Sequence, residues 1–305
     1  MPPLNYASDY ARELANAYPY VLNYGALYAT PNNGRYRMGE DAKTIYIPRI
    51  KTSGRVDSDR DTIAMATRNY DNSWEPKTLS HQRKWSTLVH PKDIDQTNMV
   101  ASIGNITQNF NETQKFPEMD AYLISRLYSL WSNVDPADSE DSAMTANTTV
   151  LTAANVLSVF DDMMLAMNNA LVPPNGRICY CTYEVEKILH EAQGVVRNLD
   201  ATRRNQINRS VTGIEGVTII GVPNVLMKTA YTFTKGWAVD AVNAKQINML
   251  LVHPSAVITP VSYEFATLDT PSAVTEGKYI YFEESYEDVF ILNKRKGALQ
   301  FNVSP

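Results

Sequence analysis

The strongest hydrophobic periodicity in the chain lies near its middle, in residues 117–131. Leu123, Leu127 and Trp131 recur at intervals of four residues, and further apolar side chains lie between them. This spacing places apolar side chains on one face of an α-helix, so it predicts an amphipathic helix. We expect the helix to begin at Pro117, because the missing N–H of proline costs nothing in a first turn.

Two stretches before this helix alternate between apolar and other residues and therefore predict β-strands. The first covers residues 43–50, where Ile45 and Ile47 alternate with Thr44 and Tyr46. The second covers residues 82–89. Pro48 has no N–H to donate to a neighbouring strand, so we expect the first strand to lie at a sheet edge.

About thirty mainly polar residues separate these two strands, which is long for a connection inside a compact domain. Two strands alone are marginally stable in water. We therefore expect an extended hairpin arm that rests on a partner subunit; the alternative is a surface loop without a partner. Residues 1–40 are rich in tyrosine and asparagine and cannot form a core of their own. We expect them to form a tail or an arm, with a short helix over residues 7–17.

A further helix is expected between the second strand and the central helix. Asp93 and Gln96 fit a capping box, with Asp93 as the N-cap residue. Met99, Ile103 and Phe110 then continue at helical spacing. The sequence thus predicts a helix that begins after Asp93 and runs to about Phe110.

Beyond residue 150, predicted strands alternate with predicted helices. The elements are a helix over residues 156–171, a strand over 177–182, a helix over 183–192, and strands over 217–222 and 247–252. This order predicts an α/β domain between about residues 150 and 255. The first of these helices contains several methionines, which we interpret as core residues and not as part of a cofactor site.

The last part of the chain contains no predicted helix. Residues 278–283, 287–293 and 298–303 predict a β-meander, with a basic run, residues 294–296, at the turn between the last two strands. We expect this turn to be solvated. We also expect the meander to pack on the helices of residues 94–134, which would make that domain discontinuous in sequence.

Composition and charge narrow the function classes. The chain has 305 residues, is 44% hydrophobic and carries a net charge of −5. An acidic chain is a poor general nucleic-acid binder, because such binding depends on basic residues that neutralise phosphates. No apolar run is long enough for a membrane span, and the N-terminus lacks the pattern of a signal peptide. Cys179 and Cys181 form no metal-binding motif, and we expect two buried thiols in a reducing compartment.

Catalytic chemistry has little support in the sequence. It contains no G-x-S-x-G, P-loop, G-x-G-x-x-G or H-E-x-x-H motif. The four histidines lie in different predicted elements, and we interpret His190 and His253 as structural. No pair of acidic residues lies in a setting that would clearly raise a pKa. We therefore predict no catalytic residue, no metal and no cofactor.

The order of these elements resembles that of the major capsid proteins of tailed bacteriophages with the Hong Kong 97 capsid fold. Four stretches carry the resemblance, namely residues 78–83 with 93–97, 117–122, 246–257 and 288–297. The resemblance implies an α+β chain with five parts. These are an N-terminal arm (1–40), an extended β-hairpin loop (41–90), a peripheral domain with the spine helix (91–149), a central axial α/β domain (150–260) and a β segment returning to the peripheral domain (261–305).

The resemblance also implies a function and a set of partners. The chain would be a structural subunit that assembles into pentamers and hexamers enclosing double-stranded DNA, without sequence-specific DNA binding and without a membrane. Assembly would take place in the host cytoplasm and end in the virion capsid, with a portal and, as an optional partner, decoration proteins. Scaffolding would come from a separate protein, or the chain is already the mature form. The residues that we expect at subunit interfaces are Ile45, Ile47, Arg55, Arg60, Arg68, Trp74 and Trp85.

Three other functions remain open from the sequence. An encapsulin-type compartment has the same fold and would hold protein cargo. An α/β hydrolase-like enzyme could use His190 or His253, although no nucleophile is evident. A carbohydrate-binding module could use exposed tyrosines. Some relatives of the capsid family link subunits covalently through a lysine of the hairpin loop. The lysines on and near the predicted hairpin lie on the strands or among polar and charged residues, so we predict no such links.

Overall fold

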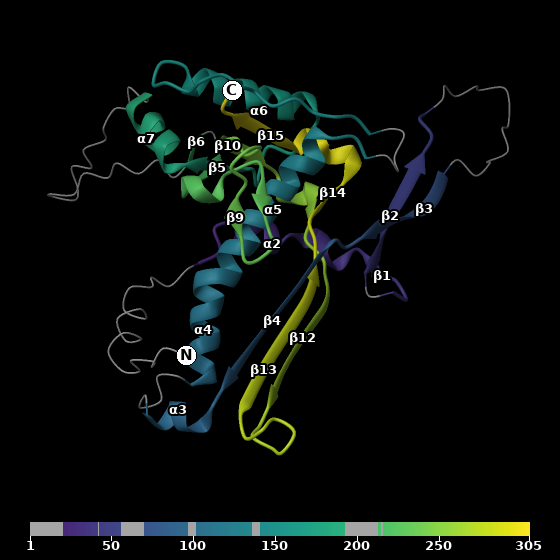
Figure 1. Cartoon of the computed structure of the whole chain (residues 1–305). Coiled ribbons are helices and arrows are strands. Elements are labelled where there is room, and N and C mark those ends of the chain that lie inside the picture. Colours follow the sequence, from purple (N-terminus) through teal and green to yellow (C-terminus); the bar gives the residue numbers. More distant parts are fainter. Residues whose placement is uncertain are drawn as a thin grey trace, which may run out of the picture.

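The computed structural model describes residues 21–41, 43–55, 70–96, 102–135, 141–192, 213–214 and 216–305. It contains helices and several separate sheets, as expected for an α+β chain. Figure 1 shows an upper body with most of the helices, a lower lobe in which a long narrow sheet runs beside a helix, and a hairpin that projects to one side.

The predicted central helix is present but begins earlier than expected. Helix α4 (Ile103–Phe110), a π-helical turn (Asn111–Lys115) and helix α5 (Phe116–Ser132) follow one another without leaving helical backbone angles. We call this continuous unit the spine helix. Pro117 therefore lies in the first turn of α5, as expected, but the π turn and α4 continue the helix before it. The π turn explains this difference, because proline lacks an N–H and its ring interferes with the carbonyl one turn earlier. The wider turn directly before Pro117 relieves that conflict.

The apolar face of the spine helix is confirmed as part of the main core. Leu123, Leu127 and Trp131 are fully buried. The expected capping box is wrong, since helix α3 (Pro91–Gln96) begins before Asp93 and the side chain of His90 accepts from the backbone N–H of Lys92. The side chain of Ser102 caps α4 instead. Met99 lies outside the described residues.

The upper body is built on a five-stranded mixed sheet in the order β15-β10-β5-β7-β6. The helices and strands predicted for this region are confirmed within a few residues. They are α6 (Val156–Asn169), β5 (Ile178–Thr182), α7 (Tyr183–Ala192), β7 (Val217–Val222) and β10 (Ile247–Val252), with β6 (Gly213–Ile214) added at one edge. The methionines of α6 are buried, as expected. Cys179 and Cys181 are free and buried in the central strand.

The predicted C-terminal meander is wrong, because its strands belong to three different sheets. Strand β13 (Tyr279–Glu287) lies in the lower lobe, β14 (Phe290–Ile291) pairs with β11 (Val257–Ile258), and β15 (Leu299–Val303) pairs with β10 in the upper body. A 3₁₀ segment (Asn293–Ala298) replaces the expected hairpin turn. The alternation of residues predicts strands locally, but it does not determine which strand each one pairs with.

The basic run in this 3₁₀ segment is not fully solvated. Lys296 is 5% exposed and its ammonium lies 2.5 Å from the carboxylate of Asp141. The same ammonium donates to the backbone carbonyl of Asn133 at 2.8 Å. A charged lysine is buried here because it has both a carboxylate and a carbonyl as partners. Lys296 thus joins the C-terminal segment to Asn133, at the end of the spine helix, and to Asp141.

The two strands expected to form one hairpin also belong to different sheets. Strand β2 (Thr44–Thr52) pairs with β3 (Tyr70–Thr78), which lies within the stretch expected to be a polar tip. Strand β4 (His81–Val89) instead pairs with β13, which pairs with β12 (Val261–Asp269), to form the lower-lobe sheet. Strand β1 (Arg37–Met38) pairs only with Tyr46 and Ile45, so Pro48 does lie where one side of β2 is open.

Part of the expected N-terminal arm is integrated into the body. The described portion contains α2 (Gly25–Tyr28) and a 3₁₀ turn (Pro31–Gly34), and Tyr24 and Leu27 are fully buried in the main core. Asp120 of the spine helix, also fully buried, accepts from the backbone N–H of Asn23 at 2.8 Å. The helix expected over residues 7–17 lies outside the described residues.

The remaining short elements are a 3₁₀ turn (Asn224–Leu226), β8 (Tyr231–Thr232), β9 (Ala238–Val239) and a 3₁₀ turn (Pro254–Ala256). Strands β8 and β9 form a small hairpin that reaches from the upper body toward the spine helix (Figure 1). Among the described residues, no helix is long and apolar enough to cross a membrane.

Candidate subunit interface and the buried junction

The residues expected at subunit interfaces fall into distinct environments. Ile45 and Ile47 are 0% and 6% exposed, because they form a small second core with neighbours from the end of the hairpin and the upper body. This core fixes the root of the hairpin within the chain and leaves both isoleucines little surface for a neighbouring subunit. Arg55 is exposed, whereas Arg60 and Arg68 lie outside the described residues.

Trp74 is an expected interface residue with a large exposed apolar side chain. It lies on β3 with 49% of its surface exposed, and it lines a hollow of about 540 Å³ together with Met38 and Tyr46. Ile50 and Tyr70, near the open end of the same hairpin, are 69% and 55% exposed. Large exposed apolar groups of this kind are typical of interaction surfaces.

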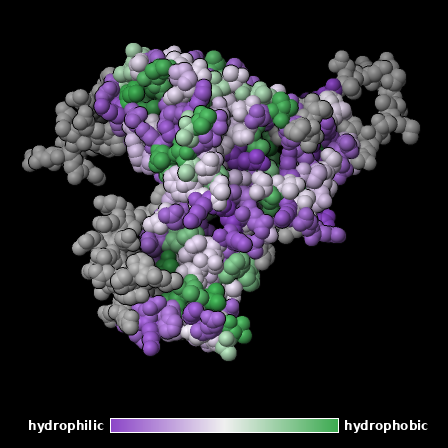
Figure 2. All heavy atoms as spheres, in the orientation of Figure 1, coloured by the Kyte–Doolittle hydropathy of each residue, from purple (hydrophilic) through white to green (hydrophobic). Residues whose placement is uncertain are grey.

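Trp85 has an intramolecular partner instead. Its ring stacks on Phe110 of the spine helix with ring centroids 3.9 Å apart, and Tyr281 of β13 lies at 5.7 Å. The outer face of the same sheet carries apolar residues: Leu88 is 56% exposed and Phe265 is 44% exposed. Figure 2 shows hydrophobic residues at the free end of the lower lobe, where this sheet ends.

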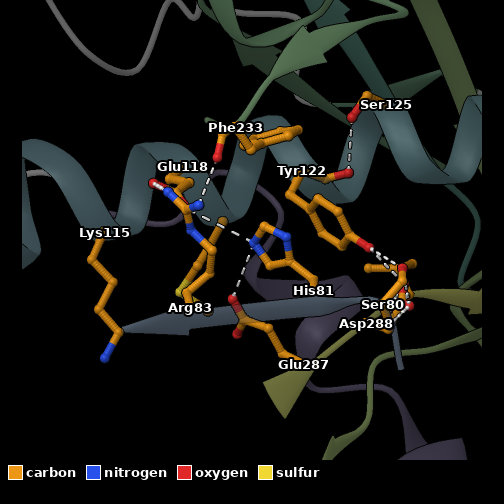
Figure 3. A network of polar contacts seen from close by, with 12 residues as sticks. Ser80, His81, Arg83, Lys115, Glu118, Tyr122, Ser125, Phe233, Glu287 and Asp288 are labelled. Atoms are coloured by element: carbon orange, nitrogen blue, oxygen red, sulfur yellow. Dashed lines mark hydrogen bonds and ion pairs between the residues drawn. The ribbon is translucent and has the colours of Figure 1, made fainter. Parts of the chain in front are cut away.

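The most connected polar group of the lower lobe is Asp288, which directly follows β13. Its side chain is fully buried and accepts from the hydroxyl of Tyr122 at 2.8 Å and from the Arg126 side chain at 3.2 Å. It also accepts from the backbone N–H and the hydroxyl of Ser80, each at 2.8 Å, and from the backbone N–H of Val289. This one carboxylate thus joins the start of β4 and the end of β13 to the spine helix (Figure 3).

A second group of ionisable side chains lies next to Asp288. His81 at the start of β4 stacks on Tyr122 with ring centroids 3.7 Å apart, and its Nε2 atom lies 3.8 Å from one carboxylate oxygen each of Glu118 and Glu287. Arg83 forms an ion pair with Glu118 and donates to the carbonyl of Phe233 at 2.6 Å. We call His81, Arg83, Glu118, Glu287 and Asp288 the buried junction (Figure 3).

Burial in the junction changes the pKa values of its groups. Burial and the nearby Arg83 lower the pKa of His81 to about 4, with Asp288 acting in the opposite direction. Burial raises the pKa of Glu287 to about 7; Lys115 opposes this rise, while the carboxylates of Glu118, Glu264 and Asp288 add to it. Burial disfavours the charged form of each group, so both tend to be neutral.

This junction was not predicted from the sequence. No role was predicted for His81, and the expectation that no acidic pair lies in a setting that clearly raises a pKa is wrong for Glu287. Glu118 and Glu287 are 169 residues apart in the chain and come together only when β13 pairs with β4. The signal that was present is the row of aromatic and ionisable residues that alternate along β4.

The two histidines considered for catalysis have structural partners. His190 lies 3.7 Å from Glu186, one turn earlier in α7. His253 caps the turn after β10, where its Nδ1 accepts from the backbone N–H of Ser255 at 3.2 Å and lies 2.7 Å from its hydroxyl. In the part of the chain that the structure describes, no group of three or more His, Cys, Asp or Glu side chains could hold a metal ion.

Solved structures of phage capsids match this arrangement over most of the chain. The mature capsid of bacteriophage PhiM1 matches with a TM-score of 0.62 and 13% identity, over 86% of this chain and 82% of that chain. The capsid of cyanophage P-SCSP1u matches with a TM-score of 0.60 and 13% identity, over 95% and 90%. The chain has a phage capsid fold. A structure of Mycobacterium phage Che8 also matches, with a TM-score of 0.58 and 12% identity, over 92% and 90%.

Sequence comparison gives no further information, since no protein-family model and no curated protein matches the chain. At 12–13% identity, these structures establish the fold and not the activity. The capsid fold expected from the order of the elements is therefore confirmed, although the strand pairings expected for the hairpin and for the C-terminal meander are different.

Proposed function

We propose that this protein is the major structural subunit of a tailed-phage head and has no enzymatic role. Its copies assemble into pentamers and hexamers that form an icosahedral shell around packaged double-stranded DNA. Assembly takes place in the host cytoplasm with a scaffolding protein and a portal. The observation that carries the proposal is the match of nearly the whole chain to phage capsid structures.

The exposed hairpin supports assembly with further copies. Strands β2 and β3 pair along nine residues, and every residue of β3 is exposed or half-exposed. Trp74, Ile50 and Tyr70 place apolar surface on a ribbon that has little core of its own beyond its root. A ribbon of this kind gains stability only by contact with a partner. The exposed outer face of the lower-lobe sheet, with Leu88 and Phe265, is a second surface suited to such a contact.

The net charge of −5 fits a shell that encloses DNA without binding its sequence. Phosphate contacts from basic residues dominate the affinity of nucleic-acid binders, and an acidic subunit provides few of them. DNA would then be retained by the closed shell and not by tight contact with each subunit.

The test is sedimentation and negative-stain imaging of the chain expressed alone and with its genomic neighbours. We expect closed shells, or separate pentamers and hexamers, in at least one of these conditions. Nuclease-protected DNA inside the particles would support the phage head, whereas protein cargo without nucleic acid would indicate an encapsulin-type compartment. A strictly monomeric chain in every condition would contradict both.

Trp74→Ala tests the role of the hairpin in the same assay. We expect subunits that fold as the unmodified chain does but form at least ~10-fold fewer particles, because a buried aromatic side chain contributes strongly to an interface. Trp74→Phe is the matched control and should assemble, since it keeps a large apolar ring. Normal assembly of Trp74→Ala would show that the hairpin contact does not depend on this residue.

A further inference from the structure

The buried junction contains an ionisable group that its neighbours do not satisfy. His81 is only 6% exposed, and its buried Nε2 atom has no hydrogen-bond partner among the described residues. It points between two carboxylates, Glu118 and Glu287, and lies 3.8 Å from each (Figure 3). Buried polar atoms in proteins normally have a partner. This spacing is too long for a hydrogen bond, so neither carboxylate satisfies the Nε2 atom.

The three side chains come from three elements that meet only here. His81 begins β4, Glu287 ends β13, and the two residues are directly paired across the sheet. Glu118 lies on the spine helix, close to the π turn. The lower-lobe sheet runs away from this point along the helix (Figure 1). The cluster thus lies at the root of the sheet, where a change in charge acts directly on the contact between sheet and helix.

We propose that His81, Glu118 and Glu287 form a proton-operated joint that controls how firmly the lower-lobe sheet is held against the spine helix. With one proton, carried by Glu287, the pair of His81 and Glu287 is uncharged and the joint is closed. Loss of that proton places a buried negative charge opposite other carboxylates and loosens the joint. This joint lies within one chain, so the inference does not depend on shell assembly.

The surrounding charges decide the effect of that proton. Glu287 lines an open cavity of about 770 Å³, so water can exchange the proton. The carboxylates of Glu118, Glu264 and Asp288 all disfavour ionisation of Glu287, and Lys115 favours it. Arg83 is engaged by Glu118, and Lys115 lies 3.3 Å from Glu283. The other titratable and charged groups that face the joint from the elements around it are Arg83, Lys115, Tyr122, Lys235, Glu264, Glu283 and Asp288.

The pH dependence of the two groups has opposite signs. Glu287 has a folded-state pKa of about 7, above the 4.5 of an ordinary glutamate, so its contribution to stability is lost as the pH rises from 4.5 to 7. His81 has a folded-state pKa of about 4, below the ordinary 6.5, so its contribution is lost as the pH falls from 6.5 to 4. Between about pH 4 and pH 7, Glu287 is protonated and His81 is neutral, so neither carries a charge. The joint is weakest above pH 7, where Glu287 is ionised, and below pH 4, where His81 is charged.

Denaturant unfolding of the full chain at pH 5 and pH 8 tests the joint with Glu287→Gln. Glutamine mimics the protonated acid, so the folding equilibrium constant of the variant relative to the unmodified chain should be 10- to ~300-fold larger at pH 8 than at pH 5. Glu276→Gln is the matched control, because Glu276 has 80% of its side chain exposed, and it should give the same ratio at both pH values. A ratio for Glu287→Gln that does not change with pH would overturn the proposal.

A measurement on the unmodified chain covers the case in which the variant does not fold. Hydrogen exchange at pH 6 and pH 8, corrected for the intrinsic rates, should show opening of β4 and β13 that is about 2- to 3-fold more frequent at the higher pH, because the loss from Glu287 is partly offset by the gain from His81. Strand β7 of the upper body serves as the internal reference and should not change. Equal opening of the three strands at both pH values would likewise overturn the proposal.

Discussion

Two β-ribbons leave the body of this molecule, and they are held in different ways. The lower-lobe sheet has every residue of β13 half-buried, and its root is fixed by the buried junction. The hairpin β2–β3 is almost entirely exposed beyond a root of five buried apolar side chains. The sheet is therefore part of the fold of one chain, whereas we propose that a partner subunit completes the hairpin. This difference separates substitutions that affect folding from substitutions that affect assembly.

The largest effect is expected in the spine helix. Leu127 is fully buried in the main core. Leu127→Asp should cost at least ~4 kcal/mol and abolish folding, because it buries a carboxylate among apolar side chains. Circular dichroism and thermal unfolding would measure the loss. The matched control is Leu165→Asp on the outer face of α6, where Leu165 is 56% exposed. A folded Leu127→Asp variant would contradict the proposed packing of the spine helix.

A smaller but still large effect is expected at the root of the sheet. Asp288→Ala removes the fully buried acceptor that Tyr122, Arg126 and Ser80 share, and it leaves the half-buried Tyr122 and Arg126 without this partner. The expected cost is ~3 kcal/mol, in the range for breaking a buried charged network. Chemical denaturation would measure it. Asp288→Asn keeps the size and one acceptor, so it should cost less than Asp288→Ala. Equal costs for the two variants would show that shape, and not hydrogen bonding, determines the stability.

The sequence predicted the upper body better than either ribbon. Strands β7 and β10 and helix α7 lie where the pattern placed them, because their buried positions follow the spacing of apolar residues in the sequence. The pairing of β4 with β13 joins residues about 200 positions apart. Alternation along β4 shows which residues face inward, but it gives no information about the partner strand.

The junction could not be predicted for the same reason. Each of its residues has an ordinary local interpretation: Glu118 resembles an acid in a first helical turn, and His81 resembles a turn residue before a strand. Their altered pKa values arise from burial that only the complete fold creates. The start of the spine helix was also missed, because proline normally indicates a helix start and the π turn that accommodates Pro117 has no simple sequence signature.

In the hairpin, truncation of a side chain to alanine should leave the stability of the single chain almost unchanged. Trp74 is 49% exposed, so Trp74→Ala should change the free energy of unfolding of the unassembled subunit by less than ~1 kcal/mol. Chemical denaturation at low protein concentration would measure this. A cost above ~2 kcal/mol would mean that the hairpin belongs to the core of the single chain and that the contrast between the two ribbons is wrong.

The smallest effect is expected from chemistry on the hairpin lysines. A lysine that forms an amide bond must attack as a neutral amine. Lys77 on β3 contacts Asp135 and lies 2.7 Å from Glu75. Burial alone would lower the pKa of Lys77, but these hydrogen bonds and charges outweigh it and raise the pKa, so the amine stays protonated at neutral pH. Particles boiled in denaturant should therefore run as a single band near the chain mass of 34.2 kDa. A ladder of multiples that survives reductant and disappears in Lys77→Ala or Lys51→Ala would show that assembly changes the surroundings of these lysines. The hairpin would then be completed by a covalent bond as well as by packing.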